Sequence, residues 1–342
     1  MSILLVGAGP IAIAYARVLA AMGRSFITVG RSDSSAERFA AQTGVMPLTG
    51  GLAGHVSGGA MASVTHAVVA VPIPELARAV ALLVDHGIKN ILVEKPAGAS
   101  RAEISALARE VRLSGASIFV AYNRRYFAST AAARQLIEED GGVTSFHVEF
   151  TERVARMKLE AWSPTVLANW FFANSSHVVD LAFHLGGRPC ELSGSVQGGL
   201  DWHPSGAVFH GSGRTLNGAT FTWHANWLSG GNWGIDLRTR RRRIVMQPLE
   251  SIQIQGPLDN ALQPMIIDDS RDRDFKPGFY GQVSAFLSER PGETHLLPLA
   301  EHARAVEAEY AAILGGARNF VVDPDTVHAK RGEERVAAVK GP

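Results

Sequence analysis

The sequence predicts a two-domain α/β protein: a doubly wound parallel sheet, then an α+β domain with a large, open, mostly antiparallel sheet. Its first third alternates short apolar strands with helices, whereas the part after about residue 190 holds strand-like segments separated only by turns. The chain has 342 residues, which favours two domains because a domain usually has about 100–200 residues.

The first domain is expected to cover residues 1–122. Strands are predicted at residues 3–6, 26–29, 67–71, 91–93 and 117–121. Helices are predicted from the end of the turn at 7–12 to about residue 22, and at about 35–42, 75–85 and 101–113. Continuous apolar runs without polar alternation are typical of parallel strands that are covered on both faces. Strands and helices that alternate at these lengths predict a right-handed parallel sheet wrapped by helices.

The second domain is expected to cover residues 123–315, followed by a polar tail at 316–342 that is mobile or packs as an extension. A helix to about residue 139 and a half-buried strand at 145–152 are followed by a helix at about 170–185. Further strands are predicted at about 192–202, 207–211, 220–228, 233–239, 244–248 and 251–254, a loop at 268–276, and helices at 280–287 and 297–313. Strands joined by short turns predict a largely antiparallel sheet.

Composition excludes several classes of protein. The net charge of +1 gives no overall field for nucleic acid or a membrane surface, and no apolar run approaches membrane-spanning length. The single cysteine, Cys190, cannot form an internal disulfide, and the chain has no Cys/His cluster with zinc-site spacing. The start of the chain lacks a basic segment and a cleavage site, so we expect a cytoplasmic protein without a secretory signal.

An arginine cluster, Arg238 with residues 240–243, lies where one predicted strand turns into the next. Alternation would divide its side chains between two faces, and no aromatic residues are interleaved with them. We therefore expect no nucleic-acid partner. Four tryptophans of this domain are expected to pack one sheet face or a subunit interface: Trp202, Trp223, Trp227 and Trp233.

The first strand runs into a glycine turn with the spacing G-x-G-x-x-A, formed by Gly7, Gly9, Pro10, Ile11 and Ala12. Gly7 permits the tight turn, Gly9 lets a pyrophosphate approach the backbone, and the small Ala12 permits close packing of helix on strand. The following helix offers free N–H groups to the phosphates. This favours dinucleotide binding over the alternative of an ordinary strand–helix turn.

The second strand ends in Gly30, Arg31 and Ser32, without the acidic residue that would bind the ribose 2′-hydroxyl of NAD. A guanidinium and a hydroxyl at this point favour the 2′-phosphate of NADP. Asp33 follows closely, so NAD stays possible, and the alternative is that Arg31 is simply a solvated loop residue.

The apolar strand at 91–93 is followed directly by Glu94, Lys95 and Pro96. Proline ends the strand, and ligands of parallel sheets bind at the carboxyl ends of strands. Lys95 is thereby a candidate for proton transfer, and Glu94, Lys95, Val71 and Pro72 are candidates for cofactor contacts. The alternative is a surface turn with one solvated lysine.

Asn174, His177, Asp180 and His184 are spaced so that they share one face of the helix expected at 170–185. A histidine titrates near neutral pH and can exchange the proton of a secondary hydroxyl during hydride transfer. His177 is therefore the candidate acid/base, whereas His184 is interpreted as structural. Metal binding by this face is possible from spacing alone, but nothing else in the chain completes a metal site.

Four motifs together resemble the glucose–fructose oxidoreductase / inositol dehydrogenase / rhizopine catabolism (Gfo/Idh/MocA) family over roughly residues 1–315. They are the turn at 7–12, Glu94-Lys95-Pro96, Arg124-Arg125-Tyr126 and His177-Val178-Val179-Asp180. The resemblance implies an N-terminal Rossmann domain, a C-terminal sheet that makes a homodimer or homotetramer, and a nicotinamide held over the substrate. It also implies that Lys95 contacts the reacting hydroxyl and that His177 is the acid/base.

The sequence departs from the family pattern in two places. Similar dehydrogenases have an aspartate four residues before the histidine, where this chain has Ala173, and the histidine often found after the proline turn is absent from residues 72–78. Either Lys95 and His177 suffice, or another group takes part. Tyr126, Glu152 and Asn174 are candidates for that role, with packing or ordinary hydrogen bonding as the alternative.

The predicted function is NAD(P)-dependent oxidation of a secondary hydroxyl on a sugar, a polyol or a nucleotide-linked sugar, with hydride transfer to nicotinamide C4. Substrate contacts are assigned to Lys95, Arg124, Tyr126, Asn174 and His177, and Arg153 and Arg156 are further candidates for holding a carboxylate or phosphate. Two alternatives stay open: a catalytically silent NADP-binding sensor, and an imine or diketone reductase on the same fold.

Overall fold

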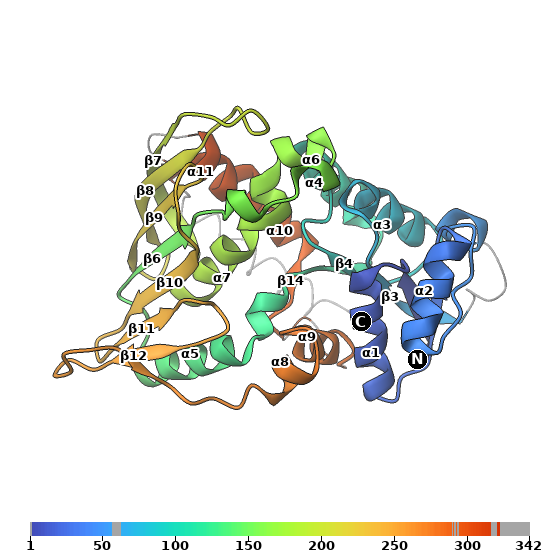
Figure 1. The fold of residues 1–342 in the computed structure, drawn as a ribbon, viewed down its shortest axis with the longest axis horizontal. Helices are drawn as coiled ribbons and strands as arrows, with labels where there is room; N and C mark the ends of the chain where they lie inside the picture. The colour runs from blue at the N-terminus through green and yellow to red at the C-terminus, as the bar shows by residue number, and fades with distance from the viewer. Residues whose placement is uncertain are drawn as a thin grey trace, which may run out of the picture. The chain divides into compact units, whose positions relative to one another are not determined.

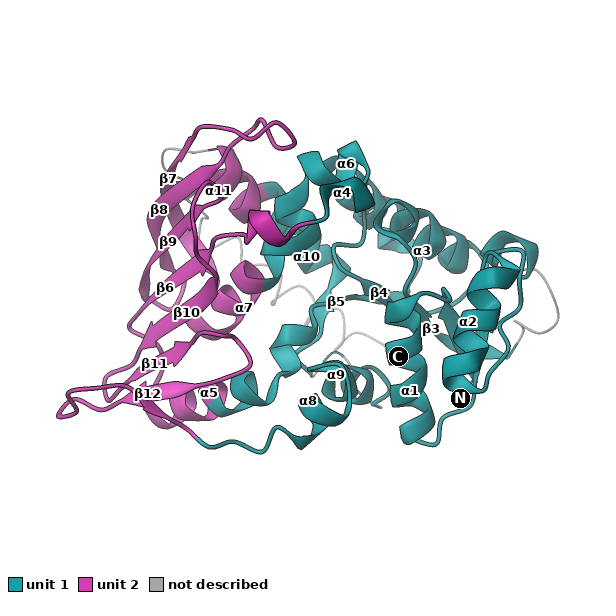
Figure 2. Cartoon of the chain, viewed as in Figure 1, with its two compact units in different colours: residues 1–132, 158–177, 266–307 teal, residues 133–157, 178–265, 308–342 magenta. Residues whose placement is uncertain are grey.

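The computed structural model describes residues 2–56, 63–288, 290, 292, 294–315 and 320–321 (Figure 1). The chain divides into two compact units, each discontinuous in sequence (Figure 2). Unit 1 comprises residues 1–132, 158–177 and 266–307, and unit 2 comprises residues 133–157, 178–265 and 308–342. The domain division at residues 122 and 315 stays a prediction, and the tail at 316–342 lies outside the described residues except for β15 (Phe320–Val321).

Unit 1 is built on a sheet with the strand order β14-β5-β4-β3-β1-β2. Its strands are β1 (Ser2–Val6), β2 (Phe26–Val29), β3 (Val64–Val69), β4 (Asn90–Glu94), β5 (Ser117–Ala121) and β14 (Leu297–Pro298). β1 to β5 are parallel, and β14 is antiparallel to β5. A parallel bridge from Leu48 to Val29 adds a one-residue strand beside β2. If the bridge at Leu48 is counted as the third strand along the chain, the bridge, β2, β1, β3, β4 and β5 lie in the order 3-2-1-4-5-6, which is the Rossmann order, and β14 lies outside β5.

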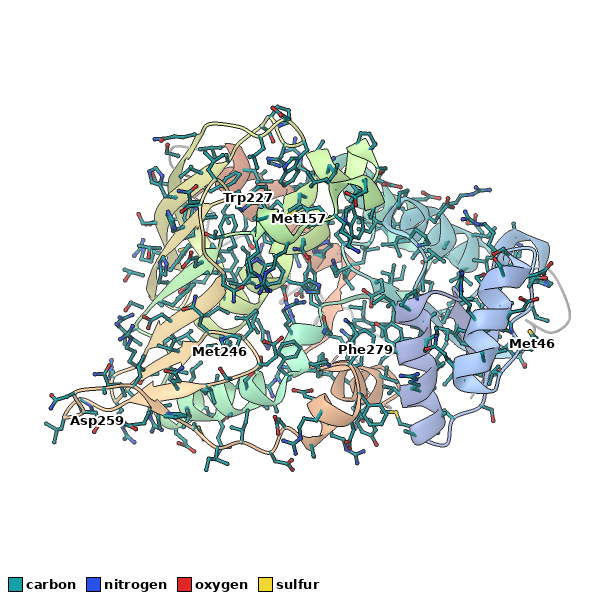
Figure 3. All side chains as sticks on the ribbon, in the orientation of Figure 1. Met46, Met157, Trp227, Met246, Asp259 and Phe279 are labelled. Carbon is teal, nitrogen blue, oxygen red and sulfur yellow. The ribbon has the colours of Figure 1, made fainter. Side chains whose placement is uncertain are left out.

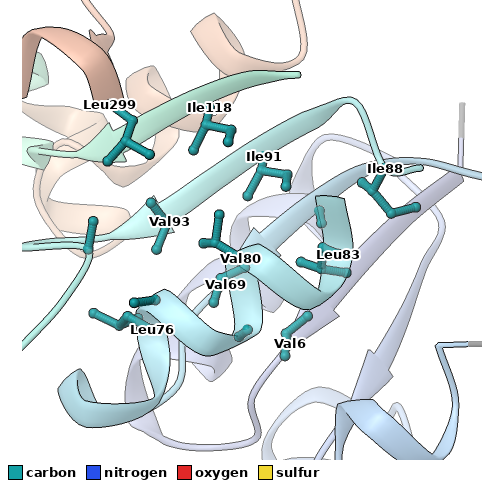
Figure 4. Close-up of a cluster of buried hydrophobic side chains, with 14 of the residues drawn as sticks. Val6, Val69, Leu76, Val80, Leu83, Ile88, Ile91, Val93, Ile118 and Leu299 are labelled. Atoms are coloured by element: carbon teal, nitrogen blue, oxygen red, sulfur yellow. The ribbon is translucent and has the colours of Figure 1, made fainter. Parts of the chain in front are cut away.

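Helices cover both faces of this sheet. Side chains alternate across each strand, so successive residues of β1 pack in two different cores. Ile3 and Leu5 pack in a core with α1 (Pro10–Ala21), α2 (Asp33–Thr43) and α9 (Phe279–Phe286). Leu4 and Val6 pack in the opposite core with α3 (Leu76–Asp85) and α4 (Arg101–Glu110), where Leu76, Val80 and Leu83 face Val69, Ile91 and Val93 (Figure 4). The predicted doubly wound fold is thereby confirmed.

Unit 2 is built on a nine-stranded open sheet with the order β13-β12-β11-β10-β6-β9-β8-β7-β15. Its other strands are β6 (Ser145–Phe150), β7 (Pro189–Gln197), β8 (Val208–Thr215), β9 (Thr220–Asn226), β10 (Trp233–Arg238), β11 (Arg243–Met246), β12 (Gln253–Gln255) and β13 (Gln263–Pro264). All neighbours pair antiparallel except β6 and β9, which are parallel. This confirms the mostly antiparallel sheet that the sequence predicts.

Several predicted boundaries were wrong. The strand expected at 192–202 ends at Gln197, because Gly198 turns the chain with φ +65°. The strand expected at 207–211 continues to Thr215. The prediction ended too early because the second half of this strand is polar and gives no apolar signal. The loop expected at 268–276 contains a short helix, α8 (Ser270–Asp274).

The helix expected at 297–313 is also interrupted. Its first two residues form β14 at the edge of the sheet, where Leu297 and Pro298 pair with β5. The helix α10 (Leu299–Ala305) then continues through a π-helical turn (Val306–Tyr310) into α11 (Ala311–Gly315). Apolar periodicity cannot distinguish such a turn from an ordinary α-helix over so short a range.

Aromatic side chains cover the buried face of the unit 2 sheet. The ring of Phe146 stacks on that of Phe221 at 5.0 Å between centroids, and Phe183 of α7 (Ser176–Gly186) meets both rings edge-on. Trp227 is buried and donates from Nε1 to the carbonyl of Phe150 at 3.2 Å (Figure 3). Trp223 is also 2 % exposed, whereas Trp202 and Trp233 are partly exposed.

Ion pairs hold part of the arginine cluster. Arg243 binds Asp236 with 2.7 Å between Nη2 and Oδ2, and Arg242 binds the buried Asp140 with 2.8 Å between Nε and Oδ2. Thr239 also donates to Asp140, at 2.7 Å. Arg242 and Thr239 therefore fasten the β10–β11 turn to the residue after α5 (Ala128–Glu139), whereas Arg243 links β11 to β10. No helix among the described residues is both long enough and apolar enough to cross a membrane.

Gly211 leaves room for an indole ring, and we expect Gly211→Ala to destabilise unit 2. An added Cβ would lie 2.1 Å from Cζ2 of Trp223 and 2.5 Å from the carbonyl oxygen of Ser193. Overpacking of this kind costs about 1–3 kcal/mol in the free energy of unfolding. The measurement is the thermal midpoint by circular dichroism. Gly230→Ala is the matched control because its Cβ would meet nothing within 4 Å, and equal midpoints for the two variants would contradict the packing described.

Candidate functional site

The glycine turn stands at the carboxyl end of β1. Gly7 adopts φ +122°, and a Cβ there would lie 2.3 Å from the carbonyl oxygen of Ala70, which follows β3. Its N–H donates to the carbonyl of Val29 at 2.8 Å. The turn is therefore locked between β2 and β3, and only glycine fits.

Gly9 is the N-cap of α1, and a Cβ at this position would meet nothing within 4 Å. Pro10 occupies the first turn of α1, where its missing N–H costs nothing, and the buried Ala12 packs against the sheet. The space beside Gly9 is thus open, while the helix itself is packed on the sheet through Ala12. This arrangement fits the pyrophosphate of a dinucleotide.

Val71 and Pro72 lie at the same edge of the sheet. The strand order reverses between β1 and β3, and open α/β sheets bind ligands at such a reversal, outside the carboxyl ends of the strands. Residue Ala70 is fixed there because its N–H donates to the carbonyl of Val6 at 2.8 Å. The structure thus brings Val71 and Pro72 to the edge that holds Gly7 and Gly9.

The segment after β2 is exposed at Arg31 and Ser32. Its backbone is held in place, since the N–H of Gly30 donates to Leu48 and that of Gly51 donates to Gly30. The hydroxyl of Ser32 bonds that of Ser35 at 3.1 Å. A guanidinium and hydroxyl groups therefore stand at the place where the sequence predicts adenosine ribose contacts.

Lys95 follows β4 directly, and its Nζ donates to the backbone carbonyl of Ala173. The Lys95–Pro96 peptide is cis, and the carbonyl of Pro96 accepts a hydrogen bond from Nε2 of His302 at 3.0 Å. His302 is fully buried on α10, and burial lowers its pKa to about 4. Two elements distant in sequence therefore hold the turn at Lys95.

Glu94 is bound on the inner side of the same turn. Its Oε1 accepts a hydrogen bond from the hydroxyl of Tyr15 at 2.7 Å, and that hydroxyl lies 3.2 Å from the amide of Gln282. Desolvation raises the pKa of Glu94, while the Tyr15 hydrogen bond and the charges of Lys95 and Lys276 act in the opposite direction. Sequence reasoning missed Tyr15, because a tyrosine on an apolar helix face gives no signal for its partner.

His177 lies at the start of α7, after a π-helical turn (Phe171–Ser175). It is 6 % exposed, and the ring of Tyr122 meets it edge-on with 5.6 Å between centroids. Burial lowers the pKa of His177 well below 6.5, and the charges of Arg124, Lys95 and Lys276 lower it further. The imidazole is therefore neutral at neutral pH and able to accept a proton.

The π-helical turn corrects one expectation from the sequence. Asn174 lies within the turn, so the α-helical spacing that placed it on one face with His177 does not hold. The turn instead presents the carbonyl of Ala173 to Lys95. Ala173 holds the position at which the family resemblance leads one to expect an aspartate. At this position the lysine is bonded by a backbone oxygen and not by a carboxylate.

Arg124 and Tyr126 lie in the short helix η5 (Asn123–Tyr126). The Asn123 side chain donates to the carbonyl of Pro277 at 2.9 Å, and the carboxylate of Asp272 accepts from the N–H groups of Ala128 and Gly278. The segment around Arg124 is thereby tied to the segment that carries Lys276. Sequence reasoning missed Lys276, because residues 268–276 read only as a charged loop.

The remaining candidates lie in unit 2. Glu152 and Asp180 are each 4 % exposed, and Arg156 ends a short helix, η6 (Val154–Arg156), that begins after Arg153. His184 lies near the end of α7. Among the residues that the structure describes, no group of three or more His, Cys, Asp and Glu side chains could hold a metal ion.

The buried His302 makes stability depend on pH. A histidine of the unfolded chain titrates near pH 6.5 and that of the folded protein at about 4, so in this window the unfolded state binds more protons. Stability that is fully present above pH 6.5 is therefore lost as the pH falls toward 4, by about 1.4 kcal/mol per pH unit.

We expect His302→Asn to flatten this dependence, as measured by urea unfolding at several pH values between 4 and 7. The contribution of His177 has the same sign and stays in the variant, so a residual slope is expected. The exposed His210→Asn is the control and should keep the slope of the original protein. An unchanged slope in His302→Asn would contradict the assignment.

Solved structures of oxidoreductases share this fold along nearly the whole chain. An oxidoreductase from Agrobacterium radiobacter, in complex with NAD+, L-tartaric acid and magnesium, is 16% identical with a TM-score of 0.74, over 96% of this chain and 99% of that one. Levoglucosan dehydrogenase, in complex with NADH and levoglucosan, is 17% identical with a TM-score of 0.72, over 95% of this chain and 99% of that one. The WlbA dehydrogenase from Bordetella pertussis, in complex with NADH and UDP-GlcNAcA, is 16% identical with a TM-score of 0.68, over 94% and 99%.

No protein-family model matches the chain, and no curated protein matches it. At these identities the likeness concerns the fold. The protein therefore has the two-sheet fold found in NAD-binding oxidoreductases and sugar dehydrogenases.

Proposed function

We propose that the protein is an NAD(P)-dependent dehydrogenase of the Gfo/Idh/MocA family, which interconverts a secondary hydroxyl and a ketone on a sugar, a polyol or a nucleotide-linked sugar. One observation carries the proposal: Lys95, which follows a strand of the sheet that carries the glycine turn, donates a hydrogen bond to the carbonyl of Ala173, four residues before the buried and neutral His177. The described relatives that bind NAD+ or NADH together with sugar-like molecules support it.

The residues at the edge of the sheet fit a dinucleotide. Gly7 and Gly9 leave the backbone before α1 uncovered, and Val71 and Pro72 stand across the strand reversal from them. When bound, the nicotinamide supplies the acceptor for the hydride that leaves the carbinol carbon. The chain itself has to orient the alcohol and receive its proton.

Lys95 and His177 divide this work. The ammonium of Lys95 donates a hydrogen bond to the hydroxyl oxygen and stabilises the negative charge that develops on it. The neutral imidazole of His177 accepts the hydroxyl proton as the C–O bond becomes a carbonyl, and it returns the proton in the reverse reaction. Tyr122 sets the position of the imidazole by its ring contact and by the hydrogen bond from its hydroxyl to Ser176 at 3.1 Å.

The cofactor preference in this proposal is NADP. Arg31 and Ser32 are exposed after β2, and Asp33 is the first residue of α2 and not the last of the strand. A guanidinium pairs well with a 2′-phosphate, whereas the ribose of NAD is usually bound by a carboxylate at the strand end.

The chain organisation follows from the same proposal. Residues 1–122 bind the cofactor, and residues 123–315 contribute to the substrate site and associate copies of the chain through the open sheet as a homodimer or homotetramer. Arg124, Tyr126 and Asn174 are proposed substrate contacts beside Lys95 and His177.

Removal of the lysine separates an enzyme from a silent sensor. We expect Lys95→Ala to lower kcat by about 10²–10⁴-fold, because general acid–base groups contribute on this order, while the NADPH dissociation constant stays within a few-fold. The measurements are NADPH formation at 340 nm with sugars and polyols, and fluorescence titration with NADPH. Lys89→Ala, just before the opposite end of β4, is the matched control. A Lys95→Ala variant with full activity would refute the assigned role.

Removal of the arginine tests the cofactor preference. We expect the original protein to bind NADPH more tightly than NADH, and Arg31→Ala to lose most of that difference, since a charge-assisted hydrogen bond contributes about 1.5–3 kcal/mol. Arg38→Ala on α2 is a control because it removes an exposed charge nearby. Tighter binding of NADH by the original protein would refute the NADP preference and leave the proposed chemistry standing, whereas binding of neither would refute the proposed function.

A further inference from the structure

Gln282 is a fully buried polar residue of α9 that the proposed chemistry does not use. Its side chain is 0 % exposed, as is that of Tyr15 beside it. A buried amide is costly unless its nitrogen and its oxygen both have hydrogen-bond partners. The partners of Gln282 therefore indicate what this side chain does in the fold.

The amide nitrogen of Gln282 bonds the group that lies beside Lys95. The hydroxyl of Tyr15 has a single hydrogen, which it donates to Oε1 of Glu94 at 2.7 Å. Its second partner must therefore be a donor, and the amide nitrogen of Gln282 takes this place at 3.2 Å. Glu94 is the last residue of β4 and immediately precedes Lys95. One end of the amide is thus connected to the lysine turn.

The amide oxygen of Gln282 bonds the backbone that follows β5. It accepts a hydrogen bond from the N–H of Asn123 at 3.2 Å. It also accepts one at 3.3 Å from the N–H of Tyr122, which is shared with the carbonyl of Val120. The Asn123 side chain donates in turn to the carbonyl of Pro277, two residues before α9. The start of η5 and the helix that carries Gln282 are therefore held together from both sides.

Tyr122 extends this connection to His177. Its ring meets the imidazole edge-on with 5.6 Å between centroids, and its hydroxyl donates at 3.1 Å to Oγ of Ser176, the residue before His177. Tyr122 is 1 % exposed and His177 is 6 % exposed. Burial is the main cause that lowers the pKa of His177. The ring of Tyr122 is therefore part of the cover that keeps this imidazole neutral.

We propose that Gln282 is a positioning residue for the proposed reaction: its amide joins the turn at Lys95 to the residue that covers His177, and so holds the lysine and the histidine in one geometry. The inference rests on the proposed function and deepens it, because it concerns the two groups that act on the substrate hydroxyl. Gln282 acts through its neighbours and does not itself touch the substrate.

The variant Gln282→Met removes the connection and keeps most of the volume. Without the amide, the backbone of Asn123 and Tyr122 loses its acceptor, and the Tyr15 hydroxyl loses its donor. A Tyr122 ring that is free to shift admits water to the imidazole of His177. Since water favours the charged form, the pKa of His177 should then rise toward its ordinary value.

The first measurement follows the proton on His177 and needs no catalysis. The histidine side chains of the full-length protein are titrated by NMR, and the resonance is assigned with His177→Gln. We expect His177 to titrate at a higher pH in Gln282→Met than in the original protein, toward about 6.5, and Tyr122→Leu to shift it in the same direction. The charged groups that act on His177 are unchanged in both variants: Arg124, Lys95 and Lys276.

The second measurement is turnover, with the sugar or polyol that the original protein oxidises fastest. We expect Gln282→Met to lower kcat roughly 10–100-fold, because a small misplacement of reacting groups costs this much, while the NADPH dissociation constant stays within a few-fold. Tyr15→Phe keeps the ring that packs on Phe279 at 4.5 Å and should lower kcat without moving the titration of His177. The double variant should lose much less than the product of the two losses, because either change breaks the same connection.

Thr239→Val is the matched control for loss of a buried hydrogen bond. Its hydroxyl donates to the buried Asp140 at 2.7 Å in unit 2. This variant should lower the thermal midpoint but leave kcat and the titration of His177 as they are. If Gln282→Met does not fold, Gln282→Asn takes its place, because its amide is one methylene too short to reach both partners, and its results are interpreted in the same way.

Three results would overturn the inference: an unmoved titration of His177 in the Gln282 variant, a kcat within a few-fold of the original, or losses that multiply in the double variant. Each of these leaves the proposed dehydrogenase function intact. Binding of neither NADPH nor NADH by the original protein would instead refute the proposed function. The titration would still show in that case whether Gln282 holds Tyr122 over His177.

Discussion

The close packing of β1 against β3 at Gly7 is the constraint on which the rest of the site depends. A Cβ at Gly7 would collide with the Ala70 carbonyl, so the two strands can approach only because this residue has no side chain. That approach sets the carboxyl ends of β1 and β3 side by side, at the reversal of strand order. The uncovered N-terminus of α1 and the turn at Lys95 then project from the same edge.

Buried polar contacts from distant segments hold the chemically important groups in place. Tyr15 of α1 bonds Glu94, His302 of α10 bonds Pro96, and Tyr122 after β5 packs between the rings of His302 and His177. The two hydrogen bonds satisfy polar groups that would be costly to bury alone, and the ring contacts of Tyr122 fill the space between the two histidines. The lysine turn and the histidine helix are therefore positioned through residues that take no direct part in proton transfer.

Electrostatics gives the site its character. Burial alone favours the neutral form of His177, and three nearby cations add to that effect, so the imidazole is suited to accept a proton. The neutral state of His177 therefore follows from where the fold places it, on a buried helix with the ring of Tyr122 packed against it.

The sequence by itself determined the fold class and the edge at which a ligand would bind. Gly7 and Gly9 between a strand and a helix, and Lys95 after an apolar strand, are local patterns, and local geometry decides them. Where a predicted strand was too short, as for β8, the part that was missed is polar and gave no apolar signal. The predicted roles of Lys95 and His177 await the experiments proposed above.

Only the tertiary structure decided what surrounds these residues. Ala173 bonds Lys95 with a backbone oxygen because a π-helical turn presents it, and apolar periodicity cannot reveal such a turn. The segment that carries Lys276 lies beside that of Arg124 because Asn123 and Asp272 tie together two segments that lie about 150 residues apart in the chain. The physical reason is the same in both cases: a partner distant in sequence is chosen by packing, and packing is a property of the folded chain.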